Sequence, residues 1–232
     1  MNDHFLSIPF PKIQKLNLTH RSTASLETLQ ALRRVVGVKY LGPSPTFSEL
    51  HVLRALLLIG EKGAIGRAAL AESLGLGHGM VRTLIERLRS EHIIKVEREG
   101  CILTKKGLLL RDGFKASIVL PQKIDAGRLA VDAHSAAILV RNAGQKVKIG
   151  LEQRDAAVRA GATGATTIIL RKGKYVVPMS STDSEREFPN EVWSTIKGIL
   201  APKDSDVIIV CSAKSEKEAE YGALAAALTF VV

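Results

Sequence analysis

The segment LGLGHGMVRTLIERL, residues 74–88, constrains the fold of this 232-residue chain more than any other part of the sequence. Its first half is rich in glycine, which favours a tight turn. Its second half carries four aliphatic residues at i, i+3, i+4 and i+7: Val81, Leu84, Ile85 and Leu88. This spacing predicts an amphipathic helix from about Gly79 to Ser90 with one apolar stripe. Such a stripe must pack against a core, so neighbouring helices are expected.

The flanking segments supply those neighbours. Thr46, with Glu49 three residues later, forms a capping-box pattern before a nearly apolar segment that Gly60 and Gly63 should end. After the amphipathic helix the hydrophobic period changes, which predicts a two-stranded hairpin, and Thr104 can cap a last helix. The predicted helices span residues 24–37, 46–60, 67–74, 79–90 and 105–114, and the predicted strands span 93–97 and 101–103.

This order of elements resembles a winged helix-turn-helix domain over residues 46 to about 114, with a short glycine-containing turn between two helices. The stretches PTFSELHVLRALLLI, LAESLGLGHGMVR and GCILTKKG also resemble an archaeal family of uncharacterised two-domain winged-helix proteins. That likeness covers most of the chain beyond Pro45. The resemblance implies a regulator-like architecture with a small C-terminal α/β domain, and it implies no particular activity.

The C-terminal half differs in kind from the N-terminal half. Strands and helices alternate irregularly there, which favours a small α+β domain over a doubly wound sheet. A hairpin should turn at Lys172–Gly173, and an alanine-rich helix should close the chain. The expected fold class is therefore α+β, with an N-terminal winged helix-turn-helix domain followed by a C-terminal α+β domain. The expected divisions are an N-terminal extension with one short helix, residues 1–45, and domains at 46–115 and 116–232.

Basic charge is concentrated in the first half of the chain. Residues 1–115 carry 18 basic and 10 acidic side chains, net +8, whereas residues 116–232 carry 15 and 13, net +2. A concentrated positive field is what a polyanion-binding surface requires.

Cys101 and Cys211 stand far apart without a metal-binding pattern, which fits a reducing cytoplasm. No apolar run reaches the roughly eighteen residues needed to span a bilayer, and residues 1–17 lack the pattern of a signal peptide, so a cytoplasmic location and no membrane partner are expected.

Burial of the aliphatic stripe should turn the other face of the helix outward. Arg82 is the residue expected to read bases, because its guanidinium matches the two major-groove acceptors of guanine. Lys95 and Arg98, on or beside the hairpin, would lie over an adjacent phosphate or the minor groove, and Arg67 would contact the backbone from the preceding helix. The expected contacts with double-stranded DNA are Arg67, His78, Gly79, Arg82, Thr83, Arg87, Lys95 and Arg98.

Two other interpretations remain open for this face. An amphipathic helix with arginines is often only a solvated surface helix, and Glu86, Glu97 and Glu99 would repel phosphates. Winged helices also serve as protein-interaction modules. In that alternative the C-terminal domain would be a ligand-binding or enzymatic unit.

The C-terminal half offers a ligand hypothesis and no catalytic motif. The loop AGATGATT, residues 160–167, is typical of a tight helix-to-strand turn, or it encloses a small effector near Arg154, Asp155 and Thr163. Asp132, His134 and Ser135 lie too close in sequence to form a hydrolytic triad. We therefore expect no enzyme activity, cofactor or metal. The alanine-rich last helix suits a core or a two-fold interface, and paired half-sites favour a homodimer.

Overall fold

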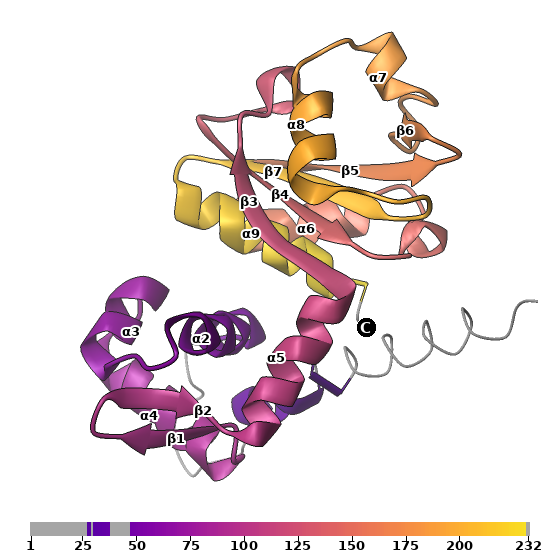
Figure 1. Ribbon diagram of the computed structural model, residues 1–232. Coiled ribbons are helices and arrows are strands. Elements are labelled where there is room, and N and C mark those ends of the chain that lie inside the picture. Colours follow the sequence, from indigo (N-terminus) through magenta and orange to yellow (C-terminus); the bar gives the residue numbers. More distant parts are fainter. Residues whose placement is uncertain (1–26, 29, 38–46, 231–232) are drawn as a thin grey trace, which may run out of the picture.

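The computed structural model describes residues 27–28, 30–37 and 47–230, and it has the mixed α+β architecture expected from the sequence (Figure 1). The N-terminal part contains helices α2 (Glu49–Lys62), α3 (Arg67–Leu74), α4 (His78–Ser90) and α5 (Lys105–Ser117). Strands β1 (Ile94–Glu97) and β2 (Gly100–Leu103) form an antiparallel hairpin between α4 and α5. Of the predicted helix over residues 24–37, the described residues 27–28 and 30–37 are helical, and 24–26 and 29 lie outside the described residues.

Helix α2 is the central element of the N-terminal core, with seven buried residues from Val52 to Ile59. It begins later than the sequence pattern predicted. Ser48 is the N-cap, and its backbone N–H donates to Nδ1 of His51 at 3.2 Å. The predicted cap, Thr46, lies outside the described residues. Gly60 does not end the helix but lies within it, where the Arg111 guanidinium donates to the Gly60 carbonyl oxygen at 3.1 Å.

The helix–turn–helix unit forms because two glycines end one helix and begin the next. Gly75 caps α3 in the left-handed conformation, at φ 66°, and Gly77 precedes α4. The predicted aliphatic stripe of α4 is confirmed, since Val81, Leu84 and Leu88 are fully buried and Ile85 packs against them. The predicted cap of α5 is also confirmed, because the Thr104 hydroxyl accepts from the Gly107 N–H at 3.1 Å.

The C-terminal part is a five-stranded sheet in the order β3-β4-β7-β5-β6, with every neighbouring pair antiparallel. This excludes a doubly wound parallel sheet, as expected. The strands are β3 (Ile118–Ile124), β4 (His134–Val140), β5 (Gly164–Arg171), β6 (Lys174–Val176) and β7 (Val207–Ala213). The helices are α6 (Leu151–Arg159), α7 (Ser184–Glu187), α8 (Val192–Leu200) and α9 (Glu216–Leu228), with short 3-10 turns η1 (Gly127–Leu129) and η2 (Gly144–Lys146).

Helices cover both faces of this sheet (Figure 1). On one face, α8 buries Trp193, whose ring stacks on Tyr175 with 5.2 Å between centroids. On the other face, α9 packs against β4 and β7, and α6 packs against β5 and α9. The alanines of α9 are buried there: Ala219, Ala223, Ala226 and Ala227. The sequence suggested that this alanine-rich helix lies either in a core or at a two-fold interface. These four alanines lie in the core of their own chain.

The two parts of the chain are joined without a linker and share contacts. Helix α5 ends at Ser117 and β3 begins at the next residue. Arg54 on α2 forms an ion pair with Glu220 on α9 at 2.8 Å. The Tyr221 hydroxyl donates to the Leu74 carbonyl at 3.4 Å, so α9 contacts the residue that ends α3.

Arg87 does not face outward, and the prediction that it contacts DNA is wrong. Its side chain is buried, its Nη1 donates to the carbonyls of Val35 and Val36 at 3.2 and 2.8 Å, and its guanidinium lies 5.5 Å from the centroid of the Phe47 ring. The helix of residues 30–37 packs along this flank of α4. Arg87 is therefore a structural residue that joins the N-terminal helix to the helix–turn–helix unit.

Replacing Arg87 with methionine should lower the free energy of unfolding by about 1–3 kcal/mol, because two buried carbonyls lose their donor while the apolar stem is kept. Arg89→Met is the matched control. Arg89 is exposed, so we expect a change within about 0.5 kcal/mol. Urea denaturation followed by circular dichroism measures both, and equal small losses in the two variants would contradict the structural role of Arg87.

Acidification should weaken the fold through His51. Burial, and next the positive charge of Lys217, hold its pKa below the usual 6.5, so the unfolded chain binds this proton more tightly and stability falls as the pH drops below about 6.5. The neutral Nδ1 also accepts the Ser48 N–H. His51→Gln keeps a capping acceptor that does not titrate. Urea denaturation at pH 7.5 and 5.5 should show a larger loss in the wild type than in His51→Gln, and parallel losses would count against this assignment.

Candidate nucleic-acid interface

The solvent face of α4 carries a stripe of charged and polar side chains. His78, Arg82, Glu86 and Arg89 follow one another at intervals of four, four and three residues, and all four are exposed. They therefore lie on one side of the helix, opposite the buried aliphatic stripe. We call this set the α4 stripe. Two of its four members, Arg82 and Arg89, are cationic.

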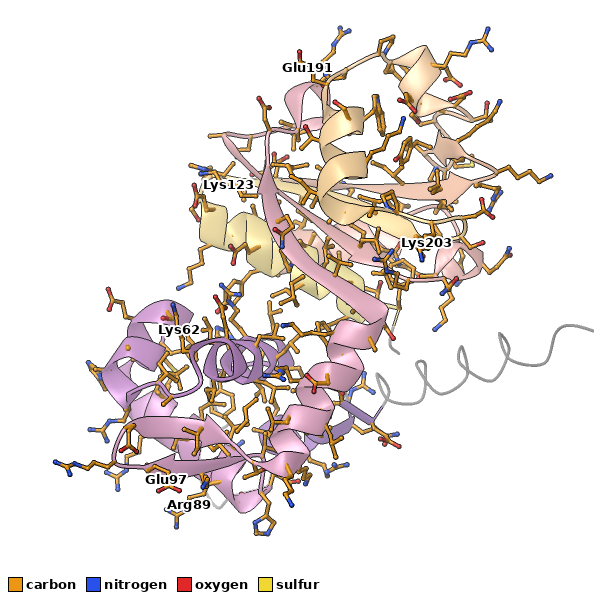
Figure 2. All side chains as sticks on the ribbon, in the orientation of Figure 1. Lys62, Arg89, Glu97, Lys123, Glu191 and Lys203 are labelled. Carbon is orange, nitrogen blue, oxygen red and sulfur yellow. The ribbon has the colours of Figure 1, made fainter. Side chains whose placement is uncertain are left out.

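The α4 stripe lies on the part of the N-terminal domain that faces away from the sheet. Figure 1 shows α4 and the β1–β2 hairpin on the side of α2 opposite the C-terminal domain. Arg89 and Glu97 lie at this outer edge in Figure 2. Sequence reasoning missed Arg89, although its spacing of seven residues from Arg82, two helical turns, was a readable signal.

The start of α4 is open to solvent. His78 and Gly79 are exposed, and a side chain placed at Gly79 would have no atom of the protein within 4 Å. Packing within this chain therefore does not require a glycine there. The first N–H groups of a helix point outward along its axis and attract anions. Thr83 is only half-exposed, and its hydroxyl donates to the Gly79 carbonyl at 3.2 Å, so it is already engaged within the helix.

The hairpin is held firmly beside the helix–turn–helix unit. Cys101 exchanges backbone hydrogen bonds with Ile65, at 2.8 and 3.1 Å. Gly100 adopts φ 130°, and a Cβ there would lie 2.5 Å from the Ile65 carbonyl oxygen. The position therefore requires glycine. Arg98, at the exposed turn, lies two residues from Gly100, so the hairpin is held close to the turn that presents this arginine.

Carboxylates accompany several of the predicted cations. Arg82 donates to Glu86 at 3.0 Å, with 71% of the arginine side chain exposed, and Lys95 pairs with Glu97 at 2.8 Å. Exposed pairs of this kind contribute only about 0–1 kcal/mol, so a phosphate or a base can replace the carboxylate at small cost. Arg67 begins α3 and is exposed.

The predicted effector residues lie in the C-terminal domain, and two of the three share a cavity. Arg154 and Thr163 both line a cavity of about 200 Å³ at the edge of β5. Asp155 does not line it, and its carboxylate lies 3.9 Å from the Arg154 guanidinium. The Thr163 hydroxyl donates to Asp132 at 2.6 Å, and this bond is the main cause that lowers the pKa of Asp132.

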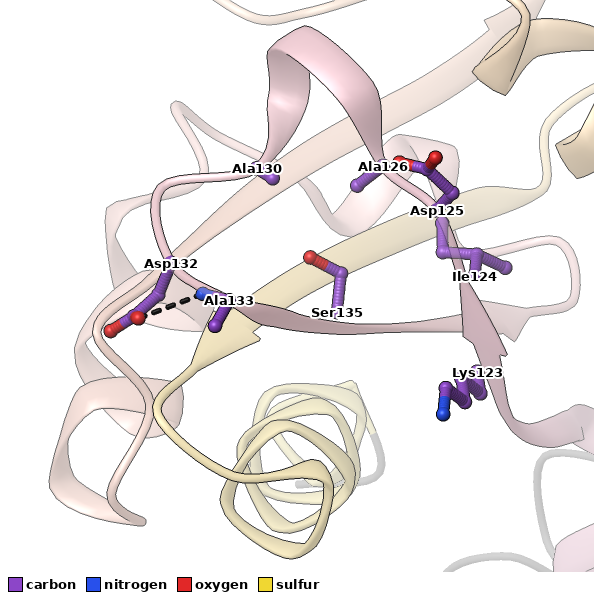
Figure 3. A pocket seen from close by; sticks show the side chains of 8 residues that line it. All are labelled: Lys123, Ile124, Asp125, Ala126, Ala130, Asp132, Ala133 and Ser135. Atoms are coloured by element: carbon purple, nitrogen blue, oxygen red, sulfur yellow. Dashed lines mark hydrogen bonds between the residues drawn. The ribbon is translucent and has the colours of Figure 1, made fainter.

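A second cavity, of about 570 Å³, is lined by residues of β3, of β4 and of the segment between them, which includes Asp132 (Figure 3). Ser135 points into it from β4, with Asp125 and Lys123 at its rim. The Ser135 and Ser212 hydroxyls are hydrogen-bonded at 3.0 Å, and Ser212 lines the smaller cavity. Ser135 therefore has a serine partner rather than a histidine, and the described residues contain no cluster of three side chains able to ligate a metal.

A third cavity, of about 840 Å³, lies between the two domains. His51 and Tyr221 line it, with their rings edge to face at 5.7 Å between centroids.

Within the described residues, no helix is long and apolar enough to cross a membrane.

Two family models match separate parts of the chain. Residues 51–108 match the family described as PH0730-like, N-terminal domain, and residues 131–230 match a domain of unknown function, DUF4443. No curated protein matches the sequence. The solved structure of the hypothetical protein PH0730 from Pyrococcus horikoshii OT3 is similar over 79% of this chain and 92% of its own, with 26% identity and a TM-score of 0.63. The chain is thus similar, in both of its parts, to an archaeal hypothetical protein.

Proposed function

We propose that this protein is a sequence-specific regulator of transcription that binds double-stranded DNA through an N-terminal winged helix. In this proposal α3, the glycine turn and α4 form the helix-turn-helix, α4 enters the major groove, and β1–β2 is the wing. The observation that carries the proposal is the α4 stripe, an exposed row with Arg82 and Arg89 on the outer side of the domain.

The groups of the interface have distinct roles. Arg82, near the start of α4, would read a base through its two-pronged guanidinium. Because Arg87 is buried, Arg89 would be the second arginine of α4 at the interface, and it would contact phosphate. His78 and Gly79 would bring the helix start against the backbone. Arg98, Lys95 and Arg67 would add phosphate contacts from the hairpin and from α3.

The C-terminal domain would pair two copies of the chain and bind a small effector. Two short reading helices gain affinity when a two-fold dimer places them on adjacent half-sites. Because the alanines of α9 are used within their own chain, the pairing surface would lie on another element. The proposal assigns no chemical step to this domain.

Salt dependence tests the proposal most directly. With about five to eight phosphate contacts, the logarithm of the association constant should fall with the logarithm of salt concentration with a slope of about −4 to −7. Fluorescence anisotropy of a labelled random duplex, titrated at several salt concentrations, measures this slope. A protein-interaction module, which the carboxylates Glu86, Glu97 and Glu99 would suit, should show no such binding.

Arg82→Ala should cost about 1–3 kcal/mol on a duplex selected by the protein from a random library and little on random duplexes. Lys95→Ala should weaken binding to all duplexes alike, because it removes a phosphate contact. Arg171→Ala is the matched control, since Arg171 is exposed in the C-terminal domain. Equal effects of Arg82→Ala on selected and random duplexes would remove Arg82 from base reading.

Glu86→Gln should raise DNA affinity several-fold, because the change removes a negative charge from the interface and frees Arg82 from its ion pair. Glu72→Gln, on the exposed face of α3, is a control with the same change in net charge. A larger gain from Glu72→Gln than from Glu86→Gln would mean that the α4 stripe does not face the duplex.

A further inference from the structure

The outer edge of β5 is only partly covered by another strand. Strand β6 pairs with Ile169–Arg171 alone, so the upstream part of β5 has no strand beside its outer edge among the residues that the structure describes. Backbone N–H and C=O groups on such an edge lack ladder partners. The cavity of about 200 Å³ is lined by Gly164, Ala165 and Thr166 in this upstream part of β5, and by Val210 and Ser212 of the neighbouring strand β7.

The cavity has one cation at its wall. Arg154 reaches it from α6, and 55% of its side chain is exposed. Its ion pair with Asp155 is 3.9 Å long, which is beyond hydrogen-bond distance. The forked donors of the guanidinium are therefore available to a ligand, and they match the two oxygens of a carboxylate.

The hydroxyl groups of the cavity differ in their availability. The Thr163 hydroxyl is engaged by Asp132 at 2.6 Å, and the buried Ser212 hydroxyl is engaged by Ser135 and by the Val131 N–H. Thr166 has no hydrogen-bond partner for its hydroxyl within the described part of the chain. Arg154 and Thr166 are thus the two polar side chains left to recognise a ligand.

The remaining walls are apolar. They come from η1, from the segment after it and from two strands: Leu129, Val131, Ala165 and Val210. Val131 is 64% exposed, so a ligand with an aliphatic body would cover apolar surface that now faces water. A volume of about 200 Å³ lies below the range of about 300–1,000 Å³ that is typical of pockets for drug-sized ligands, so the cavity suits a short aliphatic body.

We propose that this cavity binds a small aliphatic carboxylate, with its carboxylate on Arg154 and Thr166 and its hydrocarbon body against Val131 and Val210. The role of this ligand as an effector rests on the proposed DNA-binding function, whereas its binding does not. The site would then be the sensor of the regulator, on the edge of β5.

The test uses the full-length protein without DNA. Isothermal titration calorimetry with isovalerate and with L-leucine measures binding of the two acids. Isovaleramide and isoamylamine are the controls, because they keep the branched hydrocarbon chain of isovalerate and replace its carboxylate with a neutral amide or a positively charged amine. We expect saturable binding of at least one acid with a Kd of about 1 mM or tighter and no binding of the amide or the amine. Absence of binding by both acids, or equal binding of the amide, would overturn the proposal.

Two variants locate the site. Arg154→Gln should weaken acid binding by about tenfold or more, since a charge-assisted pair is lost. Arg159→Gln is the matched control, because Arg159 lies on the same helix, is exposed and does not line this cavity. Circular dichroism checks that both variants fold. Equal affinity in wild type and Arg154→Gln would overturn the assignment, and loss of DNA binding alone would affect only the proposed regulatory role.

Discussion

Helix α9 is buried on one side by the sheet and approached on another by α2, and the rest of the structure depends on this packing. A single hydrophobic core runs from the aliphatic residues of α2 through α9 to β4 and β7. Small residues make the close approach possible. A Cβ at Gly222 would lie 2.6 Å from the Cβ of Ala162, so even alanine at this position would force the elements apart. The small residues of α9 thus allow the sheet, α6 and the N-terminal helices to share one interior.

Much of the local structure could be predicted from the sequence. The bounds of α3, the Thr104 cap and the turn at Lys172–Gly173 follow from local chemistry, which acts over a few residues and is legible in one chain. The α+β class followed from the same patterns. The order of the sheet could not be predicted, because it depends on pairings between strands far apart in sequence. The start of α2 was misplaced because Ser48 and His51, a less common pair than Thr46 and Glu49, form its first turn.

The exposure of a side chain on α4 could be predicted where it depends on α4 alone. It could not be predicted where another helix covers that side chain. Periodicity placed Arg82 on the solvent side because Val81 and Leu84 face the core. Arg87 borders the same aliphatic stripe, and its environment depends on the helix of residues 30–37, which no local pattern links to α4. In the C-terminal domain, proximity in sequence suggested Arg154, Asp155 and Thr163 together. The backbone directs Asp155 away from the cavity that the other two share.

The direct junction between Ser117 and Ile118 has a mechanical consequence. Helix α5 and strand β3 form one continuous lever, braced by the Arg54–Glu220 pair across the domain contact. No linker residues separate α5 from β3, so the direction of the first β3 residues follows directly from the end of α5. In any assembly of two chains, the distance between the two α4 helices would be set by where the sheets meet. If two chains pair, the absence of a linker between α5 and β3 would restrict the range of separations that their α4 helices can adopt.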